Sequence, residues 1–119
     1  MSSTRDDPER LRDIIQASIG IERIVAGFAD REEFFEHPMA RPAALHYLMV
    51  VGEAASRLTP EIKARHSYIE WRQIVSMRNR IVHAYFDLEW RILWNAALDD
   101  LPKLRKQVEA IFTAEFPGQ

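Results

Sequence analysis

Apolar residues recur at alternating steps of three and four along most of the chain, and this spacing constrains the fold more than any other feature. The first such stretch contains Leu11, Ile14, Ile21, Val25 and Phe28, with Ser18 on the same stripe. Spacing of this kind places one side chain per turn on the same helical face. Only four glycines occur in 119 residues, and no Asn-Gly or Asp-Gly pair separates alternating apolar runs. Because β-hairpin signals are missing, the sequence predicts an all-α fold.

Proline and capping positions divide the chain into four main helices. We expect the first over 8–29 with Asp7 as its cap, the second over 42–58, the third from a Ser67–Glu70 capping box to Tyr85, and the fourth from a cap at Asp87 to Ile111. A short helical turn is expected at 59–61. Pro102 should kink or break the fourth helix near 99–101. The economical arrangement is an antiparallel four-helix to five-helix bundle that occupies residues 1–119 as a single domain.

Composition excludes several classes of function. The chain contains 16 Lys and Arg against 18 Asp and Glu, so it lacks the broad positive field of a protein that coats nucleic acid. Seven cations and four anions nevertheless lie within residues 57–91, so a nucleic-acid contact, if present, is expected to be local. The absence of cysteine excludes a thiolate nucleophile and a Cys-ligated zinc, and it fits a cytoplasmic location. No apolar run approaches the roughly 18 residues of a membrane span, so no membrane partner is expected.

Arg78 breaks the apolar stripe of the third helix. This stripe otherwise consists of Trp71, Ile74, Val75, Ile81, Val82 and Tyr85. A buried and unpaired charge costs several kcal/mol, so Arg78 must find a partner, a polar cleft or a second subunit. Glu53 is the candidate partner, because it lies among small residues on the second helix. Gly52 beside it costs about 1 kcal/mol relative to alanine within a helix, and a close approach of two helices would compensate for that cost.

His83 lies five residues after Arg78. Five helical steps turn the chain by about 500°, so His83 points roughly 140° away from Arg78, whereas Tyr85 returns to within about 20° of it. Two arrangements could bring the histidine to the arginine. Either the helix ends near His83 and the following loop swings the histidine back, or two copies of the chain meet so that the histidine of one joins the arginine of the other.

The segment from Arg78 to Tyr85 has the form Arg-x4-His-x-Tyr, and this pattern resembles the motif of the HEPN superfamily. Within that superfamily the chain resembles the small HepT-type toxins. The likeness extends to Gly52-Glu53-Ala54, to Trp71-x-x-Ile74 and to Asp100-Leu101-Pro102, and it covers residues 11–112. Length and helix order agree with it.

The resemblance implies a homodimeric, metal-independent endoribonuclease that needs no cofactor and cleaves RNA at a cleft shared by two subunits. His83 would be the general base, and Arg78 would stabilise the charge of the transition state. Asn79 would orient His83 or bind a phosphate oxygen. Arg80 and Glu53 would support the site or contact the substrate. Only RNA offers the 2′-hydroxyl that this route needs, so DNA should be inert.

The resemblance also implies a protein partner. HepT-type toxins are encoded beside a minimal nucleotidyltransferase antitoxin, and the resemblance implies that such a partner transfers AMP to the motif tyrosine, here Tyr85. The added bulk and negative charge would repel RNA from the cleft. The alternative is a non-catalytic helical adaptor that binds nucleotide or docks a nucleotidyltransferase. The presence of Arg78, His83 and Tyr85 together favours the enzyme.

Overall fold

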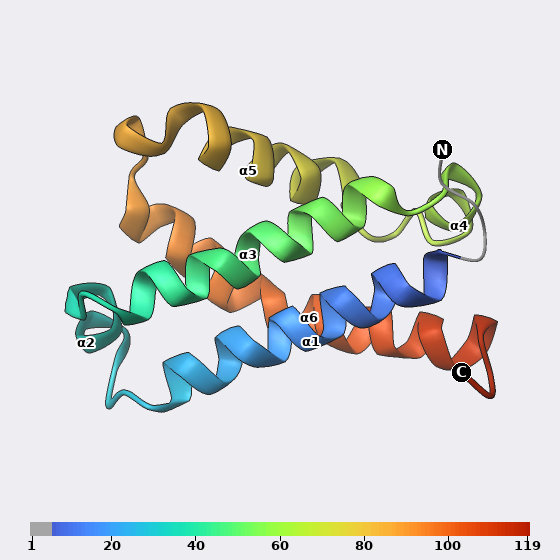
Figure 1. Ribbon diagram of the computed structural model, residues 1–119, viewed down its shortest axis with the longest axis horizontal. Coiled ribbons are helices and arrows are strands. Elements are labelled where there is room, and N and C mark those ends of the chain that lie inside the picture. The colour runs from blue at the N-terminus through green and yellow to red at the C-terminus, as the bar shows by residue number, and fades with distance from the viewer. Residues whose placement is uncertain (1–5) are drawn as a thin grey trace.

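The computed structural model describes residues 6–119, and over this range the chain is helical, without strands. The elements are α1 (Asp7–Ala26), α2 (Arg31–Glu36), α3 (Ala40–Arg57), α4 (Pro60–Arg65), α5 (Trp71–Ala84), the 3₁₀ turn η1 (Tyr85–Asp87) and α6 (Trp90–Glu115). The four long helices run lengthwise, and the short helices α2 and α4 lie at opposite ends (Figure 1). The all-α prediction is therefore confirmed, with four long helices and two short ones.

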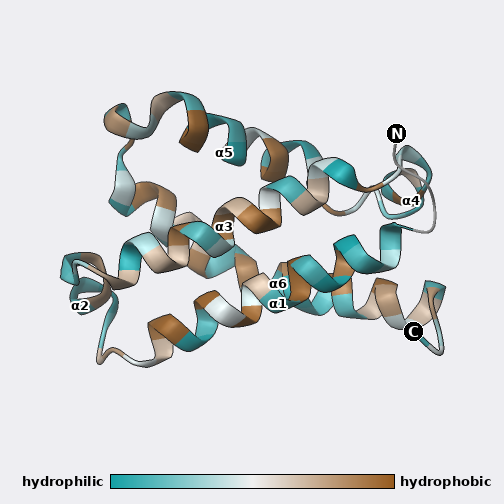
Figure 2. Ribbon diagram, viewed as in Figure 1, coloured by the Kyte–Doolittle hydropathy of each residue, from teal (hydrophilic) through white to brown (hydrophobic). Residues whose placement is uncertain are grey.

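Helix α3 is the central element of this arrangement. It contacts α1 on one side and α5 on the other, and α1 also packs against α6. Hydrophobic residues of these helices gather where the helices meet (Figure 2). The largest fully buried side chains include Trp94, Phe34, Leu11, Ile14, Ile21 and Leu48. Because α3 lies between α1 and α5, its side chains can contact residues of both helices.

The first helix begins at the expected place but uses its aspartates differently. Asp6, and not Asp7, occupies the N-cap position, and Asp7 is already helical. The buried carboxylate of Asp7 accepts hydrogen bonds from the backbone N–H of Thr59 (3.0 Å) and from its hydroxyl (2.6 Å). Thr59 in turn caps α4. Asp7 thus joins the start of α1 to the α3–α4 junction, a contact between segments that are far apart in sequence.

Two of the expected helix starts are wrong. Helix α5 begins at Trp71, so Ser67 and Glu70 do not form a capping box around its first turn. Ile69 and Trp71 are both buried, and the indole N–H of Trp71 donates to the carbonyl of His66 (3.1 Å), which holds this segment in a turn. Helix α6 begins at Trp90, because Asp87, the expected cap, belongs to the η1 turn.

Of the kink or break expected at Pro102, the break is absent, since α6 continues through it to Glu115. Leu101 and Leu104, on either side of the proline, are buried in the core. We attribute the continuity to this burial, which favours the helical path despite the lost backbone hydrogen bond. Over residues 6–119, none of the helices is both long and apolar enough to cross a membrane.

Helix α2 is an element that the sequence analysis does not predict. The side chain of Asp30 caps this helix by accepting a hydrogen bond from the backbone N–H of Glu33 (3.0 Å). Phe34 and Phe35 anchor it in the core. The capping pattern was legible in the sequence, but burial of two adjacent aromatic rings depends on the neighbouring helices.

Glu115 at the end of α6 should make stability depend on pH. It pairs with Arg65 and His66, which lie on and just after α4. The hydrogen bond from Arg65 lowers the pKa of Glu115 below its ordinary value of 4.5, and His66 adds to this effect. A carboxyl whose pKa is lower in the folded state contributes stability above its unfolded pKa and loses it as the pH falls through the folded value.

We expect the thermal midpoint of the wild type to exceed that of Glu115→Gln above pH 4.5, with a difference that shrinks at lower pH. A constant difference down to pH 3 would contradict this assignment.

Candidate active site

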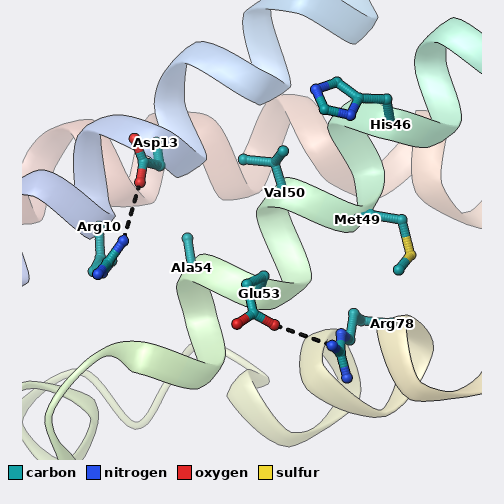
Figure 3. Close-up of a pocket in the computed structure, with 8 residues that line it drawn as sticks. All are labelled: Arg10, Asp13, His46, Met49, Val50, Glu53, Ala54 and Arg78. Carbon is teal, nitrogen blue, oxygen red and sulfur yellow. Dashed lines mark ion pairs between the residues drawn. The ribbon is translucent and has the colours of Figure 1, made fainter. Parts of the chain in front are cut away.

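The motif arginine is held between α5 and α3. Its Nη2 lies 3.2 Å from Oε2 of Glu53 (Figure 3). Its Nη1 donates to Oδ1 of Asn79 at 2.9 Å. The ion pair predicted between Arg78 and Glu53 is therefore confirmed. The Arg78 side chain is 32% exposed, so it is neither fully buried in the core nor fully solvated. An arginine held in this way keeps one orientation and still presents part of its guanidinium to the outside.

Gly52 explains how α5 comes so close to α3. A Cβ atom added at this position would lie 2.3 Å from Cβ of Arg78, far inside van der Waals contact. The close approach expected from a glycine in mid-helix is confirmed. Since Gly52 directly precedes Glu53 in the chain, the same approach brings Arg78 to its carboxylate partner.

Glu53 has a second cationic partner that the sequence analysis missed. Arg57, one turn further along α3, donates from Nε to Oε1 of Glu53 at 2.8 Å. This hydrogen bond lowers the pKa of Glu53, and the charges of Arg78 and Arg10 lower it further. Glu53 is thus a carboxylate at neutral pH and can position Arg78 by charge. The i, i+4 spacing of Glu53 and Arg57 is a sequence signal that could have identified this pair.

His83 lies in the last turn of α5 and is exposed. Because this residue is still helical, no loop carries its side chain back toward Arg78, and the first of the two arrangements considered above is wrong. Within residues 6–119, no hydrogen bond involves the imidazole of His83. In one copy of the chain, therefore, the histidine and the arginine of the motif face different directions.

The exposed face of α5 is basic. It presents Arg72, Asn79, Arg80 and His83, and the helix as a whole contains three arginines and no carboxylate. Arg72 and Arg80 also line a large hollow of about 930 Å³ between α5 and α6. The local positive excess in the sequence is thus concentrated on the helix that carries the motif.

Exposed apolar residues lie at the end of α5, next to His83. We call Val82, Tyr85 and Phe86 the apolar tip. Phe86 is 95% exposed, and Tyr85 is 42% exposed with its ring against Phe86 and Trp90, at centroid distances of 5.2 and 5.0 Å. A nearly fully exposed phenylalanine is unfavourable in water, and neighbouring exposed apolar residues often mark an interaction surface.

The three tryptophans differ in burial, and the acidic side chains within residues 6–119 are not grouped as metal ligands. Trp71 and Trp94 are buried in the core, whereas Trp90 is only partly buried beside Tyr85. Among residues 6–119, no group of three or more His, Asp or Glu side chains is arranged to hold a metal ion.

Comparison with known proteins shows which family the chain belongs to. The sequence pattern of the family described as "Ribonuclease HepT-like" matches residues 9–111, which is most of the chain. The chain belongs to this family. The match includes α3 and α5 and therefore every residue of the candidate active site, and it confirms the resemblance to HepT-type proteins.

Individual relatives agree with the family assignment. A protein of Caldanaerobacter subterraneus subsp. tengcongensis, provisionally named an RNase, is 36% identical over 84 residues, which are 71% of this chain and 75% of that protein. The "Probable ribonuclease HepT" of Thermococcus cleftensis is 30% identical over 107 residues, which are 90% of this chain and 96% of that protein. A Methanocaldococcus jannaschii protein, also provisionally named an RNase, is 28% identical over 109 residues, with coverage of 92% and 99%. No solved structure matches the chain significantly.

Proposed function

We propose that this HepT-like protein is a toxin-type endoribonuclease that cleaves RNA without a metal ion. The proposal is carried by the different surroundings of Arg78 and His83 on helix α5. Arg78 is anchored by Glu53, while His83 on the same helix is exposed and forms no hydrogen bond with any residue in 6–119. Anchoring suits a residue that must present a positive charge at a set position, and a free imidazole suits a group that must accept a proton. Membership of the family and the RNase names of its relatives support the same activity.

The reaction uses the RNA 2′-hydroxyl as its nucleophile. His83 in its neutral form accepts the 2′-hydroxyl proton, O2′ forms a bond to the adjacent phosphorus, and the bond from phosphorus to O5′ breaks. A proton is then delivered to the leaving O5′, by the histidine of a second subunit or by water. The guanidinium of Arg78 stabilises the negative charge that develops on the phosphorane oxygens. The products are a 2′,3′-cyclic phosphate and a 5′-hydroxyl.

A homodimer completes this site. His83 and Arg78 of one copy diverge along α5, so a second copy is needed to bring a histidine to the arginine. Val82 and Phe86 of the apolar tip, next to His83, supply exposed hydrophobic surface for such an association. The basic faces of two α5 helices would then line one short cleft, which suits a few phosphates of single-stranded RNA.

Dependence on the 2′-hydroxyl tests the activity directly. We expect the purified protein to cleave RNA in the presence of EDTA and to leave products that end in a 2′,3′-cyclic phosphate. The matched substrate is the same sequence with 2′-O-methyl groups, which should remain intact because O2′ can no longer lose a proton. Cleavage of the methylated strand, or of RNA only after divalent metal is added, would contradict the mechanism. A dimer that cleaves no RNA but binds a nucleotidyltransferase would favour the adaptor alternative.

We further propose that a partner nucleotidyltransferase neutralises the protein by transferring AMP to Tyr85. The partly exposed ring of Tyr85 lies at the apolar tip, two residues from His83. One or more AMP groups there would add negative charge and bulk at the mouth of the cleft. Co-expression with a nucleotidyltransferase encoded beside this protein should raise the mass of the Tyr85 peptide by one or more AMP units and abolish RNA cleavage. Tyr85→Phe should keep its mass and resist inactivation, and loss of toxicity without any modification would point to inhibition by binding alone.

A further inference from the structure

A second hollow lies beside Arg78, on the side of α3 that faces α1. It has a volume of about 350 Å³, within the range of about 300–1,000 Å³ that is usual for small-ligand sites. Its floor is a stripe of α3 that includes His46, Met49, Val50, Glu53 and Ala54. Arg10 and Asp13 of α1 form one wall, and Arg78 of α5 forms the other (Figure 3). The motif arginine thus belongs to this hollow.

The hollow contains donors that no residue in 6–119 satisfies. Nε of Arg10 and Nε of Arg78 are both shielded from solvent and lack a hydrogen-bond partner within that range. The pair between Arg10 and Asp13 is long, at 3.7 Å, and leaves most of the guanidinium free. His46 is exposed, and it takes part in no hydrogen bond with the described residues. Because solvent does not reach these two Nε atoms, a ligand does not reach them either; the donors available to an acceptor are those on the exposed 29% of the Arg10 side chain and on the exposed ring of His46.

The charges of the hollow do not suit a free phosphate alone. Asp13 and Glu53 each face one of the two arginines, so the hollow is close to neutral. Its apolar part, formed by Met49, Val50 and Ala54, offers a surface for a flat heterocycle. A ligand that combines an anion with a heterocycle matches both parts, and one nucleotide of RNA is such a ligand.

We propose that this hollow is a nucleotide subsite, in which Arg10 binds a phosphate of the RNA, while His46 and the floor of α3 contact the base of the nucleotide next to the cleaved bond. The proposal rests on the proposed ribonuclease function, because the RNA is positioned through Arg78, which borders the subsite. It assigns substrate-binding roles to Arg10 and His46, which lie outside the motif.

Titration of 3′-CMP into the full-length protein, followed by calorimetry, tests the subsite without any need for cleavage. We expect saturable binding, with inorganic phosphate at least about tenfold weaker because it lacks the base. Arg10→Ala and His46→Ala should each weaken 3′-CMP binding, by about tenfold for the charged arginine. Arg23→Ala is the matched control, since it removes an exposed arginine from the same helix away from the hollow, and it should bind like the wild type. Thermal unfolding verifies that each variant is folded. If Arg10→Ala does not fold, His46→Ala still tests the subsite, because it replaces an exposed residue.

Cleavage kinetics separate failure of the subsite from failure of the activity. If the wild type cleaves RNA, Arg10→Ala should raise KM about tenfold while kcat stays within about twofold, as expected for a residue that binds substrate equally in the ground and transition states. An active wild type whose KM is unchanged by Arg10→Ala and by His46→Ala would overturn the subsite and leave the ribonuclease proposal intact. An inactive wild type that still binds 3′-CMP through Arg10 would overturn the ribonuclease proposal and support the nucleotide site.

Discussion

Replacement of His83 by alanine is expected to slow RNA cleavage by about a hundredfold to ten-thousandfold, the usual contribution of a positioned general base. The side chain is exposed and, within residues 6–119, unpaired, so its removal should leave the thermal midpoint unchanged. Activity is measured as single-turnover cleavage of a labelled RNA, and folding by circular dichroism. Equal activity of His83→Ala and the wild type would refute the assignment of His83 as the base.

His37→Ala is a suitable control for this experiment. It also removes an exposed imidazole, but the Nδ1 atom of His37 accepts hydrogen bonds from the backbone N–H groups of Met39 and Ala40 at the start of α3. We therefore expect it to lower stability and to keep cleavage activity at temperatures well below unfolding. The two variants should thus show opposite effects on activity and stability.

Mixing two inactive variants tests whether the site is shared. If the histidine of one subunit joins the arginine of the other, a heterodimer of His83→Ala and Arg78→Ala contains one intact site and one doubly altered site. Equal amounts should then recover about a quarter of wild-type activity, because half of the dimers are mixed and each has one of two sites intact. A site within one subunit would recover nothing, since each motif would still carry a substitution.

Gly52→Ala should have the second largest effect. The new methyl group would overlap Cβ of Arg78, so α5 must move away from α3. Overpacking of this kind costs about 1–3 kcal/mol, against the roughly 1 kcal/mol that alanine gains in a helix. The displacement also moves Arg78 away from its carboxylate partner. A shift of about 1 Å at a catalytic group can lower the rate by about a hundredfold. We therefore expect a large loss of cleavage rate together with a small decrease in the free energy of unfolding.

Gly20→Ala is the matched control for this substitution. Gly20 is likewise helical, but the nearest atoms to its added Cβ would be ring atoms of Tyr47, at 2.9 Å. That ring is the far end of a side chain and can shift at small cost. We expect Gly20→Ala to retain wild-type activity and a similar thermal midpoint. If Gly52→Ala were as active as Gly20→Ala, the close approach of α3 and α5 would not be needed for the site.

Local patterns were sufficient for much of the fold. The three-and-four spacing identified the long helices, because one residue per turn determines which face of a helix is buried. The same spacing marked Arg78 as a charge on an apolar stripe, and the small residues around Glu53 marked Glu53 as its candidate partner. Helix boundaries were less reliable. The start of α5 depends on burial of Ile69 and Trp71, and the continuity of α6 depends on burial of Leu101 and Leu104, which no local pattern specifies.

By itself, the sequence determined the all-α class, the motif on one helix and the angular separation of Arg78 and His83, because these follow from helical geometry within a single segment. Only the tertiary structure decided how near α3 lies to α5, which residues share Glu53, and that Arg10 and His46 border a hollow with Arg78. Such relations join side chains from α1, α3 and α5, and they depend on how closely the helices approach. That approach is set at Gly52, where the missing side chain makes room for Arg78.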